Sequence, residues 1–158
     1  MKDTDWHVPL SAGDLTLRQG LDSLAEVAAR QQEIPLIIRL LENPKYSLPG
    51  LTLFHGAVDL KSHDRIHILL GRGLRTEDEA FTIGFTMGST KRVRRSEEWL
   101  FGMLARYVYP QTYTFDNCAV RIFNDAVRLG GISGCQPLDT IEFDQYLDSP
   151  LREVREHV

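Results

Sequence analysis

The apolar residues of this chain fall into short stretches with helical spacing, and a glycine or a proline closes most of these stretches. Between Asp14 and about Gln32 the apolar side chains recur at steps of three and four, at Leu17, Leu21, Leu24, Val27 and Ala28. Such steps place the side chains on one face of an α-helix. With 158 residues, 42% of them hydrophobic, the chain can bury one core. We predict an all-α fold, a single domain over residues 1–158 with about six to eight helices.

The limits of the other helices follow from proline, glycine and capping residues. A helix beginning at Pro35 should stop at Asn43, because the residue before a proline is pushed out of the helical region. Asp116 is expected to cap another helix, and Ser149-Pro150 to open the last one. The predicted helices span residues 14–32, 35–43, 63–70, 76–87, 96–107, 117–129 and 150–155, with loops at 47–50 and 132–140. Residues 51–60 fit a short strand nearly as well as a helix, and we expect them to be irregular or helical.

Net charge and cysteine content argue against several classes of protein. The formal net charge is −4, which gives no global attraction to nucleic acid, so we expect no nucleic-acid partner. Cys118 and Cys135 form no C-x-x-C motif and nothing upstream resembles a secretory signal. We therefore expect a reducing, cytoplasmic environment without disulfides. The apolar runs also fall short of the roughly 20 residues that a membrane-spanning helix needs.

The segment from residue 62 to residue 67 reads Ser-His-Asp-Arg-Ile-His and holds two of the five histidines. On a helix, His63 and His67 lie roughly 40° apart around the axis, with Asp64 roughly 60° further round. All three side chains then share one face. Two imidazoles one turn apart beside a carboxylate are ligands that a divalent metal such as zinc accepts.

Glu79 follows His67 after a glycine turn at residues 71–73 and could complete a metal site between two consecutive helices. The turn can fold the start of the second helix back beside the end of the first. The predicted ligands are then His63, Asp64, His67 and Glu79. An alternative role stays open for Glu79, because Thr76 and Glu79 have the spacing of a capping box at a helix N-terminus.

Two known classes of metal enzyme fit this pattern less well. Zinc proteases carry H-E-x-x-H, in which a glutamate is the general base, whereas this chain has the shorter Asp64. Phosphohydrolases of the HD superfamily also use an adjacent His-Asp pair, but normally with another histidine well upstream and an aspartate well downstream. His55 is only eight residues before His63, so we leave it out of the predicted site.

The sequence His63-Asp64-x-x-His67, then eleven residues, then Glu79 resembles the metal signature of the coenzyme Q (ubiquinone) biosynthesis protein 4 family. Leu69-Leu70-Gly71 after the second histidine is similar as well. The end of the chain supports the resemblance with Pro150-Leu151-x-x-Val154-Arg155, preceded by Glu142-Phe143-Asp144. The likeness runs loosely from about residue 48 to the terminus.

The resemblance implies an all-α fold and a metal, usually taken as zinc, held by catalytic ligands at His63, Asp64, His67 and Glu79. It implies work on isoprenoid-tailed ring intermediates of ubiquinone synthesis, either by oxidative decarboxylation at ring carbon one, a lyase activity, or by organising a membrane-associated assembly. Other ubiquinone-biosynthesis proteins are then partners, and peripheral membrane contact and a homo-oligomer are options. Two alternatives stay open, a metal-dependent hydrolase of the HD type and a non-catalytic lipid-binding scaffold.

Three further features have two interpretations each. Gly84 and Gly88, four residues apart, permit close approach either of a neighbouring helix, the simpler case, or of a ligand. The apolar segment 80–87 would line a pocket for the isoprenoid tail or belong to an ordinary core. The basic run at Lys91-Arg92-Val93-Arg94-Arg95 would meet anionic lipid headgroups or form a solvated loop.

Overall fold

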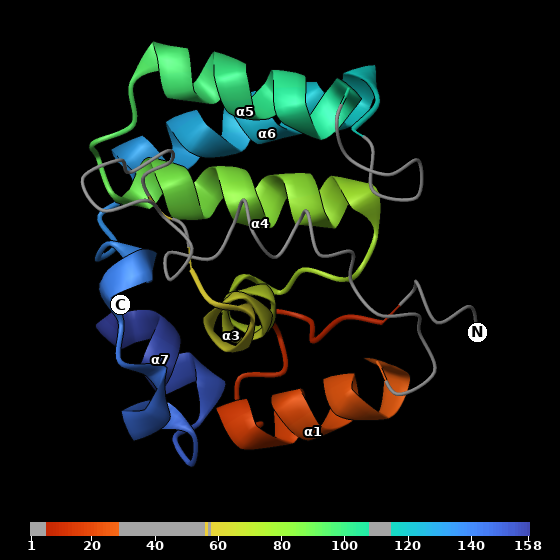
Figure 1. Cartoon of the computed structure of the whole chain (residues 1–158). Helices are drawn as coiled ribbons and strands as arrows, with labels where there is room; N and C mark the ends of the chain where they lie inside the picture. The colour runs from red at the N-terminus through yellow and green to blue at the C-terminus, as the bar shows by residue number, and fades with distance from the viewer. Residues whose placement is uncertain (1–5, 29–55, 57, 108–114) are drawn as a thin grey trace.

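The computed structural model describes residues 6–28, 56, 58–107 and 115–158, and within them the chain is helical (Figure 1). The helices are α1 (Leu17–Ala28), α3 (Leu60–Leu70), α4 (Thr76–Ser89), α5 (Arg95–Tyr107), α6 (Asn117–Ile132) and α7 (Leu151–His157), with short 3₁₀ helices η4 (Leu138–Thr140) and η5 (Phe143–Tyr146). Among the described residues, β-type pairing is confined to one isolated bridge between Thr16 and Pro150. The predicted all-α fold is confirmed.

Local sequence explains most of the helix ends. The Asp116 side chain accepts a hydrogen bond of 2.7 Å from the Ala119 amide, so the predicted cap of α6 is confirmed. Asp59 caps α3 in the same way, accepting from the Ser62 amide at 2.8 Å. Gly71 ends α3 with φ 66° and ψ 32°, the left-handed conformation that glycine adopts without steric cost.

Other sequence predictions need correction or lie outside the described residues. Pro150 is the residue before α7 and not its first helical residue, and the predicted loop at 132–140 contains η4. In α5 the buried side chains include Phe101 and Ala105, whereas Trp99 is exposed. The predicted helix at 35–43, the loop at 47–50 and most of the uncertain segment 51–60 lie outside the described residues.

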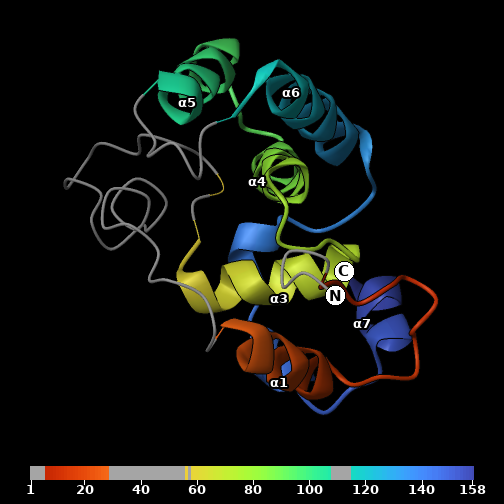
Figure 2. The same ribbon diagram turned by 90° about the vertical axis from the view of Figure 1, so that its right-hand side faces the viewer.

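The helices form two layers (Figure 2), each with its own apolar cluster. α4, α5 and α6 surround one cluster, in which the rings of Phe101 and Phe123 stack with centroids 5.0 Å apart. α1, α3 and α7 surround the other, which includes Leu17, Ile66 and Leu151. Helices α3 and α4 are consecutive but belong to different layers, so the turn between them crosses from one layer to the other.

Glycines bring α4 and α6 into backbone contact. A Cβ atom built on Gly84 would lie 2.4 Å from the Phe123 carbonyl oxygen, and one on Gly88 would lie 2.1 Å from that of Val127. Gly130 of α6 meets α4 in the same way, since its Cβ would lie 2.4 Å from the Phe85 carbonyl oxygen. The approach predicted for the two α4 glycines is therefore confirmed, and a neighbouring helix fills the space.

Arg155 of α7 fixes the C-terminal end of α3. Its guanidinium donates to the carbonyls of Leu69 at 2.9 Å and Ile68 at 3.1 Å, and to the carbonyl of Leu10 at 2.9 Å. The last carbonyls of a helix have no partner within the helix, so a cation that donates to them stabilises that end. None of the described helices is long and apolar enough to cross a membrane.

Replacing Gly84 or Gly88 by alanine should destabilise the protein, because the added methyl group would overlap the α6 backbone. Overpacking of this kind costs about 1–3 kcal/mol or more. Gly102→Ala in α5 is the matched control, since among the described residues its Cβ would meet only Val120, at 4.0 Å, and a helical Gly→Ala change without a clash stabilises by about 0.5–1 kcal/mol. Urea denaturation of the three variants measures the difference. Equal stability of all three would contradict the packing of α4 on α6.

Candidate metal centre

Helix α3 supplies both histidines of the predicted site from one face. The cap at Asp59 sets the start of the helix, and the spacing of four residues places His63 and His67 one turn apart. Their rings meet edge to face with centroids 4.7 Å apart. His67 is only 2% exposed and belongs to the buried face of α3, together with Ile66, Ile68 and Leu69.

The turn after α3 brings Glu79 to these histidines. Gly71 leaves the helix in the left-handed conformation, and the Arg72 amide donates to the His67 carbonyl at 2.9 Å. Gly73 then passes close to the N-terminal segment, where a Cβ would lie 2.5 Å from the Trp6 carbonyl oxygen. Helix α4 begins three residues later, and its first turn presents Glu79 toward α3.

The capping-box alternative for Glu79 is wrong. The residue that precedes α4 is Arg75, and no side-chain hydrogen bond caps the helix there. The Glu79 carboxylate instead contacts the two histidines, with its Oε1 2.7 Å from His63 Nε2 and its Oε2 3.0 Å from His67 Nε2. The carboxylate that local sequence would assign to the N-terminal cap of α4 therefore contacts the histidines of α3 instead.

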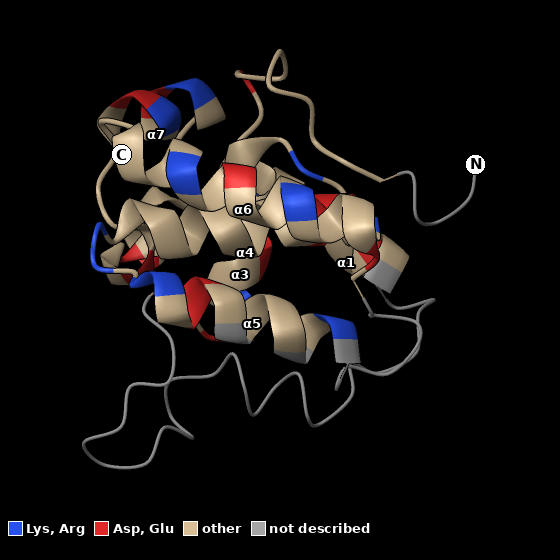
Figure 3. Cartoon of the chain, turned by 90° about the horizontal axis from the view of Figure 1, so that it is seen from above, with Lys and Arg blue, Asp and Glu red and all other residues tan. Residues whose placement is uncertain are grey.

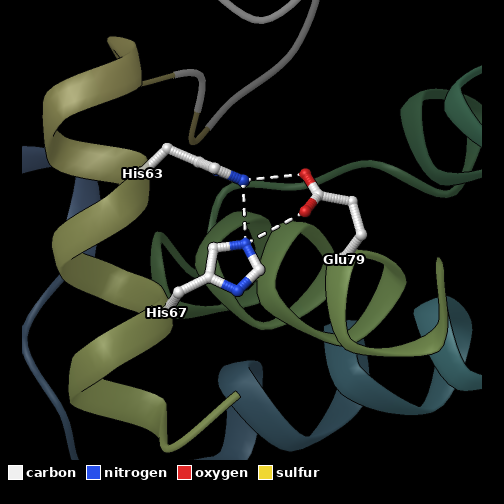
Figure 4. Close-up of side chains that lie close together, drawn as sticks. All are labelled: His63, His67 and Glu79. Atoms are coloured by element: carbon white, nitrogen blue, oxygen red, sulfur yellow. Dashed lines mark hydrogen bonds and ion pairs between the residues drawn. The ribbon is translucent and has the colours of Figure 1, made fainter. Parts of the chain in front are cut away.

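Three candidate ligand atoms therefore converge on one point (Figure 4). The two Nε2 atoms of His63 and His67 are themselves 3.0 Å apart, which closes a triangle with Glu79. One ligand atom from each of the three residues lies within 4.8 Å of those of the other two. The structure thus brings together three of the four predicted ligands, from two consecutive helices.

Asp64 lies outside this group of three. On the helix it lies roughly 60° beyond His67 and roughly 100° from His63, at the edge of the face that the two histidines share. Burial raises the pKa of the Asp64 carboxyl, while the charges of His63 and His67 act in the opposite direction. Asp64 is thus within electrostatic range of the cluster without being one of its converging ligands.

Hydrogen bonds alone cannot explain all three short contacts between His63, His67 and Glu79. Each imidazole Nε2 has one hydrogen-bonding direction, which either donates a proton or accepts one. If both histidines donate to Glu79, neither Nε2 has a lone pair left for the other, and their 3.0 Å contact is not a hydrogen bond. If instead one histidine donates to the other, the acceptor loses its bond to an ionised Glu79. At most two of the three short contacts are full hydrogen bonds in any protonation state.

A divalent cation resolves this conflict, because all three atoms then donate lone pairs to it. Two imidazole nitrogens and one glutamate oxygen form a donor set that zinc enzymes use, with a further position left for water or substrate. Ligand bonds of about 2.0–2.1 Å in a tetrahedral site separate neighbouring ligand atoms by roughly 3.3 Å. The observed separations of 2.7, 3.0 and 3.0 Å involve both oxygens of Glu79, because His63 contacts Oε1 and His67 contacts Oε2. Each separation is a few tenths of an ångström shorter than this ligand spacing.

The electrostatics of Glu79 agree with a role as an anionic ligand. Burial alone would raise the pKa of its carboxyl, but the charges and hydrogen bonds of His63 and His67 hold that pKa well below its ordinary value. The side chain is 30% exposed, so the cluster is open to solvent on the Glu79 side and closed on the side of His67.

Thr82 supports the cluster from behind, and sequence reasoning did not identify it. Its Oγ1 lies 3.4 Å from Nδ1 of His67, the ring nitrogen that faces away from the triangle. Thr82 is fully buried and one turn after Glu79, so α4 supplies both a ligand and an orienting hydroxyl. A partner on the second nitrogen of a metal-binding histidine fixes the tautomer and the ring orientation. The one sequence feature that could have identified Thr82 is its position three residues after Glu79, on the same face of the helix.

Comparisons with known proteins identify no relative of the chain. No family model matches it, and neither the curated proteins nor the solved structures contain a significant match. The assignment of function consequently depends on the geometry of the cluster and on the motif resemblance.

Thr82→Val should weaken zinc binding by about 10–100-fold, the usual effect of losing an outer partner of a metal ligand. Thr86→Val is the matched control, because Thr86 is also buried in α4 but its hydroxyl donates only to the Thr82 carbonyl, at 2.7 Å. Thr82→Ser keeps the hydroxyl and should keep the affinity. Competition with a zinc chelator dye measures all three variants. Equal affinities for Thr82→Val and Thr86→Val would exclude an orienting role.

Proposed function

We propose that the chain binds one divalent cation, zinc by its donor set, through His63, His67 and Glu79. The observation that carries this proposal is the triangle of three short contacts, of which hydrogen bonds account for at most two. Structural zinc sites are usually closed by four protein ligands, whereas three protein ligands are typical of catalytic sites. The described residues supply three converging ligands, which favours a site that acts on a bound molecule.

We further propose that the bound molecule is an isoprenoid-tailed ring intermediate of ubiquinone synthesis. The support is the motif from His63 to Glu79 and its resemblance to the coenzyme Q biosynthesis protein 4 family. The proposed reaction is oxidative decarboxylation at ring carbon one, and organisation of the biosynthetic proteins is a second role within the same proposal. A bound cation supplies Lewis-acid polarisation of a carboxylate or ring oxygen and stabilises charge that develops as carbon dioxide leaves.

The residues of this chain have separate tasks in that proposal. His63, His67 and Glu79 bind the cation, and Thr82 orients His67. Asp64, next to His63 in the chain, is the predicted ligand that the three others leave unused, and in this proposal it exchanges a proton with a bound substrate. The sequence carries no redox-cofactor motif, so an oxidative step would need molecular oxygen, a redox-active metal or a partner enzyme.

Much of the apolar segment 80–87 is already used by the fold. Ala80, Ile83 and Met87 belong to the buried cluster between α4, α5 and α6, and Gly84 is covered by α6. Phe81 and Phe85 are only partly buried and stack with ring centroids 5.9 Å apart. An isoprenoid tail bound along α4 would therefore contact these two rings and not the whole apolar segment.

The metal proposal predicts about one equivalent of zinc per chain and a large loss of affinity in ligand variants. His63→Ala and Glu79→Gln should each lower zinc affinity by more than the roughly 100-fold expected for an outer partner, because the first removes a coordinating nitrogen and the second replaces an anionic oxygen ligand with a neutral amide. His157→Ala is the control, since His157 is exposed on α7 and away from the cluster. Elemental analysis and zinc titration provide the measurement. A zinc content that the two ligand variants do not change would refute the site.

Zinc should also stabilise the fold. A ligand present at about 100 times its dissociation constant adds about 2.7 kcal/mol to the free energy of unfolding, so a chelator should lower the melting temperature of the unmodified chain. The His63→Ala variant should show no such chelator effect.

Disruption of the metal site in the host tests the pathway. Loss of Glu79 should lower the level of ubiquinone-type quinones and allow the carboxylated ring intermediate to accumulate, which mass spectrometry of extracted lipids would measure. If quinone levels stay normal although the unmodified protein binds zinc and the Glu79 variant does not, the metal-dependent hydrolase would be favoured. Retained capture of biosynthetic partners by the Glu79 variant, with no decarboxylation by the unmodified chain, would favour the lipid-binding scaffold.

A further inference from the structure

The end of α4 opposite the metal centre carries the densest group of cations in the chain. Lys91, Arg92, Arg94 and Arg95 are all exposed between α4 and the first turn of α5 (Figure 3). None of the four forms an ion pair with another described residue, whereas Arg18, Arg65 and Arg152 each pair with an aspartate. The protein as a whole carries a net charge of −4, so this positive region is local.

Lys91 occupies a backbone conformation that favours glycine. Its φ is 55°, and it is the one non-glycine residue with positive φ in the described part of the chain. A residue other than glycine in this region costs on the order of 1–3 kcal/mol and persists where the surrounding structure enforces it. The Lys91 amide donates to the Gly88 carbonyl at 2.9 Å, which fixes the turn. A glycine would relieve the strain, yet the position holds a cation.

Large apolar side chains are exposed at the same end of the molecule. Ile132 is 83% exposed and Leu129 is 45% exposed, both in the last turn of α6. The ends of α4 and α6 meet, because a Cβ on Gly130 would lie 2.9 Å from the Ser89 amide nitrogen. Trp99 is 68% exposed and lies one turn after Arg95 on the same face of α5. We call these three side chains and the four cations the basic-apolar end.

We propose that the basic-apolar end docks on an anionic phospholipid surface. Tryptophan and aliphatic side chains insert at the level of the headgroups, and clustered Lys and Arg contact the lipid phosphates. Only charges within about a Debye length of the surface contribute, about 8 Å at physiological salt. Glu97 and Glu98 in the first turn of α5 offset part of the attraction, but the four cations outnumber them, and acidic residues farther away do not contribute. Nucleic acid would match the cations but gives Ile132 and Leu129 no apolar environment.

The docking surface and the metal centre are separate. Glu79 is in the first turn of α4 and Lys91 follows its last residue, which puts roughly 18 Å of helix between them. Lipid docking therefore depends neither on the metal nor on the proposed reaction. Variants of one region test that region alone.

Vesicle sedimentation tests this proposal, with phosphatidylcholine vesicles and with vesicles that contain about 30% phosphatidylglycerol, an anionic lipid. The unmodified protein should bind only the anionic vesicles, and binding should fall as salt screens the charges. The Lys91→Gln/Arg94→Gln double variant should lower the partition coefficient roughly 30-fold. Lys61→Gln/Arg121→Gln is the matched control, since it removes one exposed Lys and one exposed Arg from other parts of the surface and should bind as the unmodified protein does.

Tryptophan fluorescence tests the apolar half of the surface. Trp6 is buried and Trp99 is exposed, so a blue shift on adding anionic vesicles should come from Trp99 and disappear in Trp99→Phe. His63→Ala should keep both vesicle binding and the blue shift.

Three results would overturn the docking proposal. Equal binding to neutral and anionic vesicles is one, and equal losses in the two double variants are another. The third is displacement from vesicles by single-stranded RNA at equal phosphate concentration together with an unchanged Trp99 spectrum, which would assign the cations to nucleic acid.

Discussion

The backbone contact between α4 and α6 is the constraint on which the rest of the structure depends. Gly84, Gly88 and Gly130 let the two helices approach until side chains no longer separate them. Helix α4 is held by this contact on one side and faces α3 on the other, as Figure 2 shows. Its orientation decides where Glu79 lies at one end and where the basic run lies at the other. The packing of α4 on α6 therefore determines the positions of both the proposed metal site and the proposed docking surface.

The metal centre places ligands from both layers of the protein at one point. His63 and His67 come from the layer of α1, α3 and α7, and Glu79 comes from the layer of α4, α5 and α6. Two further contacts fix the α3 side, since Arg155 holds its C-terminal carbonyls and Gly71 turns the chain back. The three short contacts between ligand atoms conflict when only protons join them. That conflict is the observation that supports the proposed cation site.

Sequence reasoning predicted the local elements well where a single residue type dictates the backbone. Asp116 caps α6, Gly71 ends α3 in the left-handed conformation, and the two histidines share one face of α3. It also predicted that Glu79 lies beside the two histidines, and only the capping-box alternative was wrong, because the histidines of another helix contact the same carboxylate.

The sequence by itself determined the helical class, the pair of histidines one turn apart and the presence of a dense basic run, because each depends only on residues within a turn or two of one another. Only the tertiary structure decided that Glu79 rather than Asp64 completes the cluster, that Thr82 stands behind His67, and that Ile132 and Leu129 share an end with Lys91. These facts join residues from different helices. Their distances depend on how α4 packs against α3 and α6, and neither spacing nor composition encodes that packing.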